Sequence, residues 1–192
     1  MRGFEGASID EVAEVARAGK TTIYARYAGK KDLFAAVALR NVSSMVQIEE
    51  TSPQGATVEA RLRTLGANIV ARAMSHKAIR LFRVTLSEAE RFPDIASQVS
   101  QLARERGIEE VARLLGEWNG APEACPDGDA SASQPLEEAK IFMDLIVLPM
   151  VLRRLFGESE VTLQAEISDH VADRVAFFLA GSQMRRPATG EA

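Results

Sequence analysis

The residues best suited to chemistry lie close together near the N-terminus, and the chemistry they suit is phosphate binding. Between Val15 and Lys31 the sequence holds five basic residues and no acidic residue. Two threonines and two tyrosines are interleaved with them, and their hydroxyl groups can bind phosphate oxygens without adding charge. The segment predicts a surface that contacts a nucleic-acid backbone. The alternative is a solvated basic helix face that binds nothing.

The charge of the whole chain conceals this segment. The 192 residues carry a formal net charge of −4, which argues against coating nucleic acid or an anionic membrane by bulk charge. Residues 1–40 hold seven basic and five acidic residues, a sum of +2, so the remaining 152 residues carry −6. Basic charge is therefore confined to one end of an otherwise acidic chain.

Two short helices must position the basic residues. Ser8 and Glu11 have the spacing of a capping box, which predicts a helix from Ser8 to about Ala16. A break at residues 17–19 precedes a second helix from Lys20 to Tyr27. Two short helices around a tight turn that contains glycine are typical of a helix-turn-helix, in which the second helix reads DNA.

The second helix divides its residues between the core and the surface. Ile23 and Tyr27 are four residues apart and are predicted to face inward, which leaves Tyr24 and the threonine pair outside. Ala28 and Gly29 end this helix, and Lys30 begins a longer one. Leu33 and Phe34 are predicted to be core residues.

The rest of the chain has helical periodicity, and the predicted fold class is all-α. Residues 52–55 and Phe92-Pro93 interrupt the pattern, with Pro93 suited to the first turn of a new helix. The longest predicted loop runs from Asn119 to Pro135 and is rich in Gly, Pro, Ser and Asp.

The ordered pattern from Ser8 to Phe34, SIDEVAEVARAGKTTIYARYAGKKDLF, resembles the helix-turn-helix signature of the TetR family of bacterial transcription regulators. Residues 82–93 and 144–157 are similar to the effector domain of one TetR subgroup. Arg17 and Gly19 depart from the family pattern, which usually has Gly and Ser there. The family also has a helix before Gly3–Gly6, so we expect a DNA-binding domain that lacks its usual first helix.

The resemblance implies a DNA-binding domain in residues 1–40 and a ligand-binding and dimerisation domain in residues 41–192. It implies a repressor that binds a double-stranded DNA operator and is released by a small hydrophobic effector. By position, Lys20, Thr21 and Ala25 would approach base edges, and Thr22, Tyr24, Arg26 and Lys30 would hold phosphates. Arg17, in the turn, completes the predicted DNA-binding residues.

The segment Ile141–Leu152 is apolar around most of a helix, so it must be covered on more than one side. A homodimer solves this, and in the family the last two helices of each subunit form a four-helix interface. The alternative is a core within one chain. The predicted interface residues are Leu145, Leu148, Met150, Leu152, Val171, Val175 and Phe178.

The middle of the chain, about residues 54–118, is predicted to enclose the effector. Apolar walls with few polar groups suit a small hydrophobic molecule, although the same residues also suit plain core packing. The predicted lining residues are Met74, Phe82, Leu86, Phe92, Trp118, Phe142 and Met143.

Other functions find less support in the sequence. Gly19-Lys20-Thr21-Thr22 is not a phosphate-binding P-loop, because Glu14 stands where that loop needs glycine. His76 and His170 lack the Glu-x-x-His spacing of a di-iron bundle, and the single Cys125 has no partner at metal-ligand spacing. We therefore expect no cofactor, no metal and no enzymatic activity.

One alternative function remains open. The expected lack of a first helix allows a truncated regulatory module that dimerises but binds DNA poorly or not at all. The chain shows no signal peptide and no apolar run long enough to span a bilayer, and its one cysteine suits a reducing compartment. The expected location is the cytoplasm, without membrane association.

Overall fold

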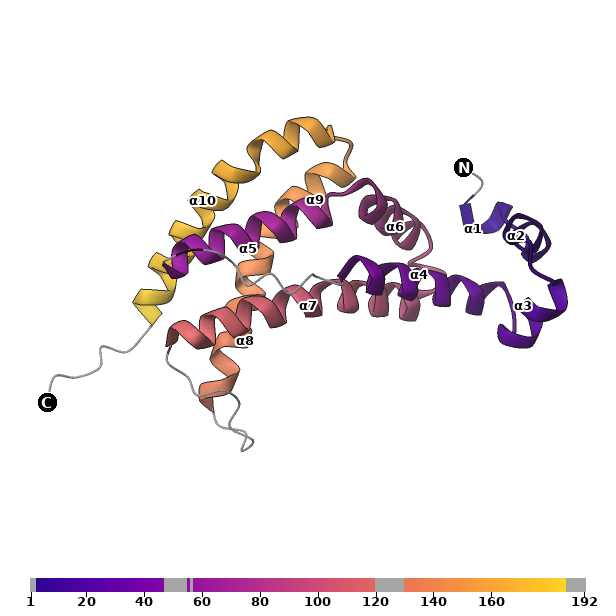
Figure 1. Ribbon diagram of the computed structural model, residues 1–192, viewed down its shortest axis with the longest axis horizontal. Helices are drawn as coiled ribbons and strands as arrows, with labels where there is room; N and C mark the ends of the chain where they lie inside the picture. The colour runs from indigo at the N-terminus through magenta and orange to yellow at the C-terminus, as the bar shows by residue number, and fades with distance from the viewer. Residues whose placement is uncertain (1–2, 47–54, 56, 120–129, 186–192) are drawn as a thin grey trace, which may run out of the picture. The chain divides into compact units, whose positions relative to one another are not determined.

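The computed structural model describes residues 3–46, 55, 57–119 and 130–185 (Figure 1). Every regular element in this part of the chain is helical, so the predicted all-α fold class is confirmed. No helix within the described ranges is long and apolar enough to cross a membrane. The break expected around residues 52–54, and Cys125, lie outside the described residues.

The chain divides into two compact units. Unit 1 comprises Met1–Gln47 and Arg80–Ala103, and unit 2 comprises Ile48–Ile79 and Arg104–Ala192. Residue 40, where the sequence placed the end of the DNA-binding domain, lies inside a helix of unit 1. Segments far apart in the sequence therefore contribute to each unit.

Unit 1 contains the predicted helix-turn-helix. Its first helices are α1 (Gly3–Gly6), α2 (Ile9–Ala16), α3 (Lys20–Arg26) and α4 (Lys30–Val46). Most of α6 (His76–Ser87) and the first part of α7 (Pro93–Asn119) also belong to this unit. Pro93 begins α7 as predicted, in the turn where its missing N–H costs no hydrogen bond.

Two small apolar cores hold unit 1 together. Ile9, Ala13 and Ile23 join α2 to α3, and Leu33 and Tyr27 pack against them. The second core joins α4 to the first half of α7 through four buried residues: Ala38, Val42, Ile95 and Val99. The long helix α4 thus contacts both cores, which fixes α3 relative to the rest of this unit.

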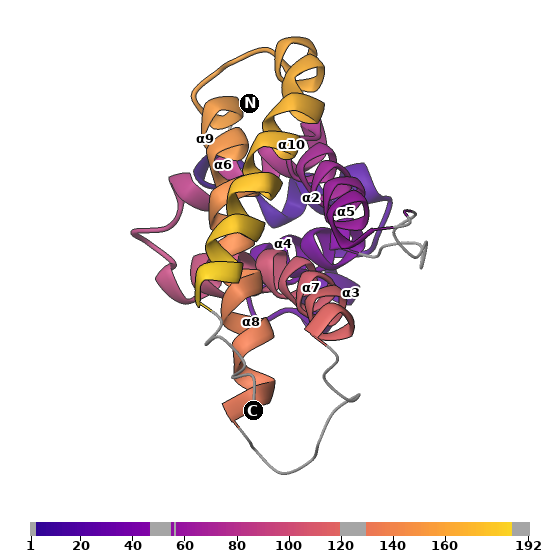
Figure 2. The same cartoon turned by 90° about the vertical axis from the view of Figure 1, so that its left-hand side faces the viewer.

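Unit 2 has a single large core. It is built by α5 (Val58–Ala73), the second part of α7, and the helices α8 (Ala130–Phe142), α9 (Leu148–Leu155) and α10 (Glu160–Arg185). A π-helical segment, η1 (Met143–Val147), joins α8 to α9, and the three follow one another in Figure 2. The rings of Phe142 and Phe178 meet edge to face at 5.5 Å and tie α8 to α10.

The prediction that a loop extends to Pro135 is wrong at its C-terminal end. Helix α8 begins at Ala130, so residues 130–135 are helical. Serine, alanine and glutamine tolerate a helix, and Pro135 is buried on the face that packs inward. Composition alone predicted a loop here because it did not take account of packing against the core.

Candidate nucleic-acid interface

The first helix of the helix-turn-helix is capped as its sequence predicts. The Glu11 N–H donates to Ser8 Oγ at 3.0 Å, and the Ser8 N–H donates to Glu11 Oε2 at 3.1 Å. This capping box satisfies two backbone N–H groups that the helix leaves unpaired. It fixes the residue at which α2 begins.

The turn between the helices contains a strained residue. Arg17 ends α2 with φ 50° and ψ 36°, the left-handed conformation that glycine adopts without cost. It is the one non-glycine residue with positive φ in the described ranges. Its N–H donates to the carbonyl oxygens of Ala13 and Glu14, so a tight turn forms without glycine at this position.

Helix α3 presents its polar residues to solvent and buries one apolar residue. Ile23 is buried and Tyr27 packs against the same core, as predicted. Tyr24 is 54% exposed. The structure brings six predicted DNA-binding residues together on the exposed surface of this short helix: Lys20, Thr21, Thr22, Tyr24, Ala25 and Arg26.

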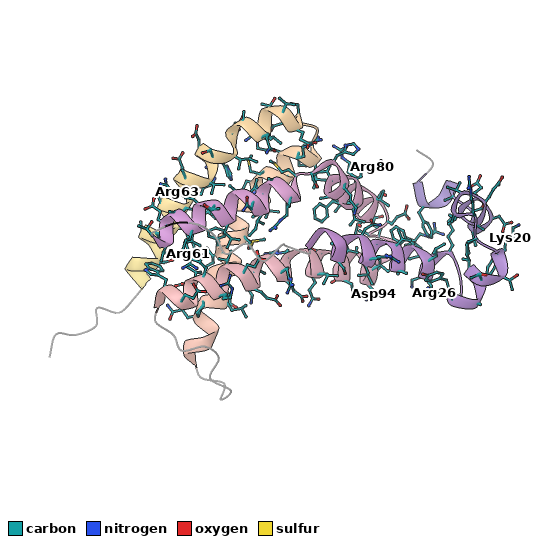
Figure 3. All side chains as sticks on the ribbon, in the orientation of Figure 1. Lys20, Arg26, Arg61, Arg63, Arg80 and Asp94 are labelled. Carbon is teal, nitrogen blue, oxygen red and sulfur yellow. The ribbon has the colours of Figure 1, made fainter. Side chains whose placement is uncertain are left out.

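Two basic residues mark the ends of α3. Lys20 and Arg26 are its first and last residues, and both are exposed (Figure 3). Lys20 Nζ lies 2.8 Å from Asp10 Oδ2 of α2. A pair as exposed as this one contributes little stability, so the Lys20 ammonium can leave Asp10 for another partner at small cost.

Lys30 begins α4 and lies beside an aromatic cluster that sequence reasoning missed. The cluster consists of Phe4, Phe34 and Phe92, with the Phe4 ring 5.2 Å from Phe34 and 5.0 Å from Phe92. Lys30 Nζ is 4.5 Å from the centre of the Phe4 ring. The cluster thus fixes α1 and the start of α4 together and positions the Lys30 ammonium.

Two further cations surround the same rings. The guanidinium carbon of Arg91 lies 5.3 Å from the ring centres of both Phe4 and Phe92, and Lys31 Nζ lies 5.6 Å from the ring centre of Phe92. Phe4 and Arg91 are far apart in the sequence, so no local pattern joins them. The spacing of aromatic residues alone could not have found this cluster.

The predicted effector-lining residues do not fall in one unit. Four belong to the core of unit 2 or pack against it: Met74, Trp118, Phe142 and Met143. Three lie in unit 1: Phe82, Leu86 and Phe92. Leu86 is 61% exposed, and Phe92 belongs to the aromatic cluster.

The predicted dimer residues also divide into two groups. Four are buried in the core of their own chain: Met150, Val171, Val175 and Phe178. Leu148 and Leu152 are 45% and 42% exposed, and Leu145 is partly buried. Of the predicted interface residues, only this second group is exposed enough to contact a second copy of the chain.

Comparison with known proteins agrees with this geometry. Residues 60–181 match the family model described as the C-terminal domain of AefR-like transcriptional repressors, and residues 1–37 match that of bacterial regulatory proteins of the tetR family. The chain belongs to the TetR family. It is a transcription regulator with a helix-turn-helix domain. Because TetR-family proteins are regulators and not enzymes, membership of the family supports the expectation of no enzymatic activity.

A solved structure supports the same assignment. A crystal structure from Mesorhizobium loti, assigned to the TetR family of transcriptional regulators, is similar with a TM-score of 0.72 and 25% sequence identity. The match covers 94% of this chain and 88% of that one. A search of curated proteins finds no match. TetR regulators bind DNA and typically form dimers, which is the setting for the residues described above.

Proposed function

We propose that this TetR-family protein is a homodimeric repressor that reads its operator with α3 and is released by a small effector bound in unit 2. One observation carries the DNA-binding part of the proposal. Helix α3 buries Ile23 while it exposes Lys20, Tyr24 and Arg26, so its apolar side fixes it to α2 and its polar side remains available.

The exposed side chains suit the two kinds of contact that operator recognition requires. Lys20 and Thr21 begin α3, and the N-terminal residues of a recognition helix are those that reach base edges. Tyr24, Arg26 and Lys30 carry groups that bind phosphates, which set register and orientation. The pair of recognition helices in a dimer would read two halves of a symmetric operator.

Release follows from linkage between two sites. An effector that binds better to a conformation unsuited to the operator weakens DNA binding by its differential affinity for the two conformations. The matched AefR-like repressor domain supports unit 2 as the place for that effector, because residues 60–181 include almost all of its core.

The test is a fluorescence anisotropy titration against the DNA upstream of the protein's own gene. We expect Tyr24→Ala and Lys30→Ala each to weaken specific binding at least about tenfold, because each removes a phosphate contact made by a positioned side chain. Arg106→Ala is the control: Arg106 is exposed and lies 3.6 Å from Glu109 of its own helix, in unit 2.

Two results would contradict the proposal. If both α3–α4 variants bind specific DNA as tightly as the wild-type chain, the interface is misplaced. If affinity does not fall as salt rises, phosphate contacts do not drive binding, because such contacts release counterions.

A further inference from the structure

In the part of unit 2 that the structure describes, the Glu138 carboxylate is buried and no ion pair includes it. Glu138 lies on the face of α8 that also carries Pro135, Ala139 and Phe142, which are spaced i, i+3, i+4 and i+7 and are all buried. Only 5% of Glu138 is exposed. Ala139, the next residue, and Phe142, one turn further along this face, belong to the apolar core of unit 2.

The hydrogen bonds of Glu138 do not compensate for this burial. Its Oε2 atom is buried and has no hydrogen-bond partner. Its Oε1 atom accepts one long bond of 3.4 Å from Gln134 Nε2. A single neutral amide donor returns little of the free energy that a carboxylate loses when it leaves water.

Most of the cations described in unit 2 contact other carboxylates, and Arg174 donates to the His170 carbonyl oxygen. Lys140, two residues along α8, lies 2.6 Å from Glu137, and Arg153 contacts Glu158 and Glu166. Arg61 and Arg113 contact Glu117, Arg72 faces Glu110, and Arg104 contacts Asp144. None of the ion pairs that the structure describes includes Glu138.

We propose that Glu138 anchors a ligand site in unit 2 whose occupant is a small organic amine, protonated at neutral pH and carried on an apolar body. An N–H donor that bears positive charge forms the strong, short hydrogen bond that Oε2 lacks. The apolar neighbours on α8, and the edge-to-face pair of Phe142 and Phe178, suit the rest of such a molecule. A neutral hydrocarbon would leave Oε2 without a partner, and an anion would be repelled.

This inference rests on the proposed function in one respect: it gives the proposed effector a chemical class. The binding test is therefore made without DNA. The probe is 4-phenylbutylamine, and its neutral analogue 4-phenylbutan-1-ol differs only in replacing the ammonium group with a hydroxyl. Isothermal titration calorimetry on the full chain compares the wild type with Glu138→Gln and Glu137→Gln.

The two variants are matched because they make the same chemical change at adjacent positions of one helix. Glu137 is exposed and paired with Lys140, whereas Glu138 is buried. We expect the amine to bind the wild type and Glu137→Gln alike, and to bind Glu138→Gln at least about tenfold more weakly. The alcohol binds all three chains with equal, lower affinity.

Several outcomes would overturn the inference. It fails if the amine does not bind the wild type at millimolar concentration, or if Glu138→Gln binds it equally well. It also fails if Glu138→Gln melts at a lower temperature than both other chains, because the carboxylate would then already be satisfied in the folded protein.

Operator titrations with and without the amine separate this inference from the proposed function. If the wild-type chain binds its operator but does not bind the amine, the result counts against the amine site and not against the proposed function. Amine binding through Glu138 that leaves operator affinity unchanged supports the site and counts against its role as the effector site.

Discussion

At the scale of single residues, the turn of the helix-turn-helix is determined by Arg17. Its backbone is left-handed, and a side chain there costs roughly 1–2 kcal/mol relative to the right-handed conformation. The chain accepts this strain because the turn places Gly19 and Lys20 at the start of α3. The left-handed backbone at Arg17 therefore lowers the stability of the folded chain.

Arg17→Gly is expected to raise the free energy of unfolding by up to about 1 kcal/mol, because glycine removes the strain but gains freedom in the unfolded chain. Arg26→Gly is the comparison. Arg26 is also an exposed arginine, but it is the last residue of α3 and its backbone is helical, so glycine there should lower stability, by less than about 1 kcal/mol. Urea denaturation followed by circular dichroism measures both, and equal signs for the two variants would refute the assignment of strain.

At the scale of elements, the π segment η1 depends on a histidine of α10. His170 Nε2 donates to the Ile146 carbonyl oxygen at 2.8 Å, which holds a backbone group inside the widened turn. Burial lowers the pKa of His170, and Arg174 and Arg153 act in the same direction. The Ile146 carbonyl and Glu166 oppose this shift, and the net effect is a pKa of His170 below its ordinary value, which favours the neutral ring in the folded chain.

The sign of the pH dependence follows from this lowered pKa. As pH falls through the ordinary histidine pKa of about 6.5, His170 binds a proton more readily in the unfolded chain than in the folded chain. The free energy of unfolding therefore falls as pH falls. His170→Gln keeps an N–H donor for the Ile146 carbonyl but does not titrate. Between about pH 7.5 and pH 5.5, we expect the wild type to lose more unfolding free energy than His170→Gln, as measured by urea denaturation. Identical losses would show that His170 does not titrate differently in the two states.

The sequence predicts local elements better than distant contacts. Ser8 and Glu11 carry their capping signal within four residues, and Ile23 with Tyr27 defines the inward side of α3, so both were predictable. The ring cluster of Phe4, Phe34 and Phe92 depends on chain folding across many residues, and no local pattern encodes it. Helix α8 was partly missed because packing overrides the loop-like composition of residues 130–135.

At the scale of the whole molecule, the chain has apolar surface that its own fold leaves exposed. Leu148 and Leu152 lie one turn apart on α9, and each is more than two-fifths exposed. In contrast, Val171 and Val175 of α10 are buried in the core of unit 2. The exposed pair therefore supports the proposed dimer, while the sequence could not separate it from the core residues.

Leu148→Glu combined with Leu152→Glu is expected to convert the dimer to monomers, because burying two carboxylates in an apolar interface is costly. Analytical ultracentrifugation measures the mass. Val15→Glu serves as the control, since Val15 is the most exposed valine of α2 and lies in unit 1. If the double variant stays dimeric and Val15→Glu becomes monomeric, the interface lies in unit 1 and the prediction is wrong.

The central claim is that α3 of each subunit reads one half of a symmetric operator. The most direct measurement is a footprint on the DNA upstream of the protein's own gene, with the wild type, Tyr24→Ala and Arg106→Ala compared at equal concentration. We expect two symmetric protected segments whose centres are about one helical turn, or a multiple of it, apart. Tyr24→Ala should lose this protection and Arg106→Ala should keep it. Protection that survives Tyr24→Ala, or a single unsymmetrical segment, would show that α3 does not read the operator in this way.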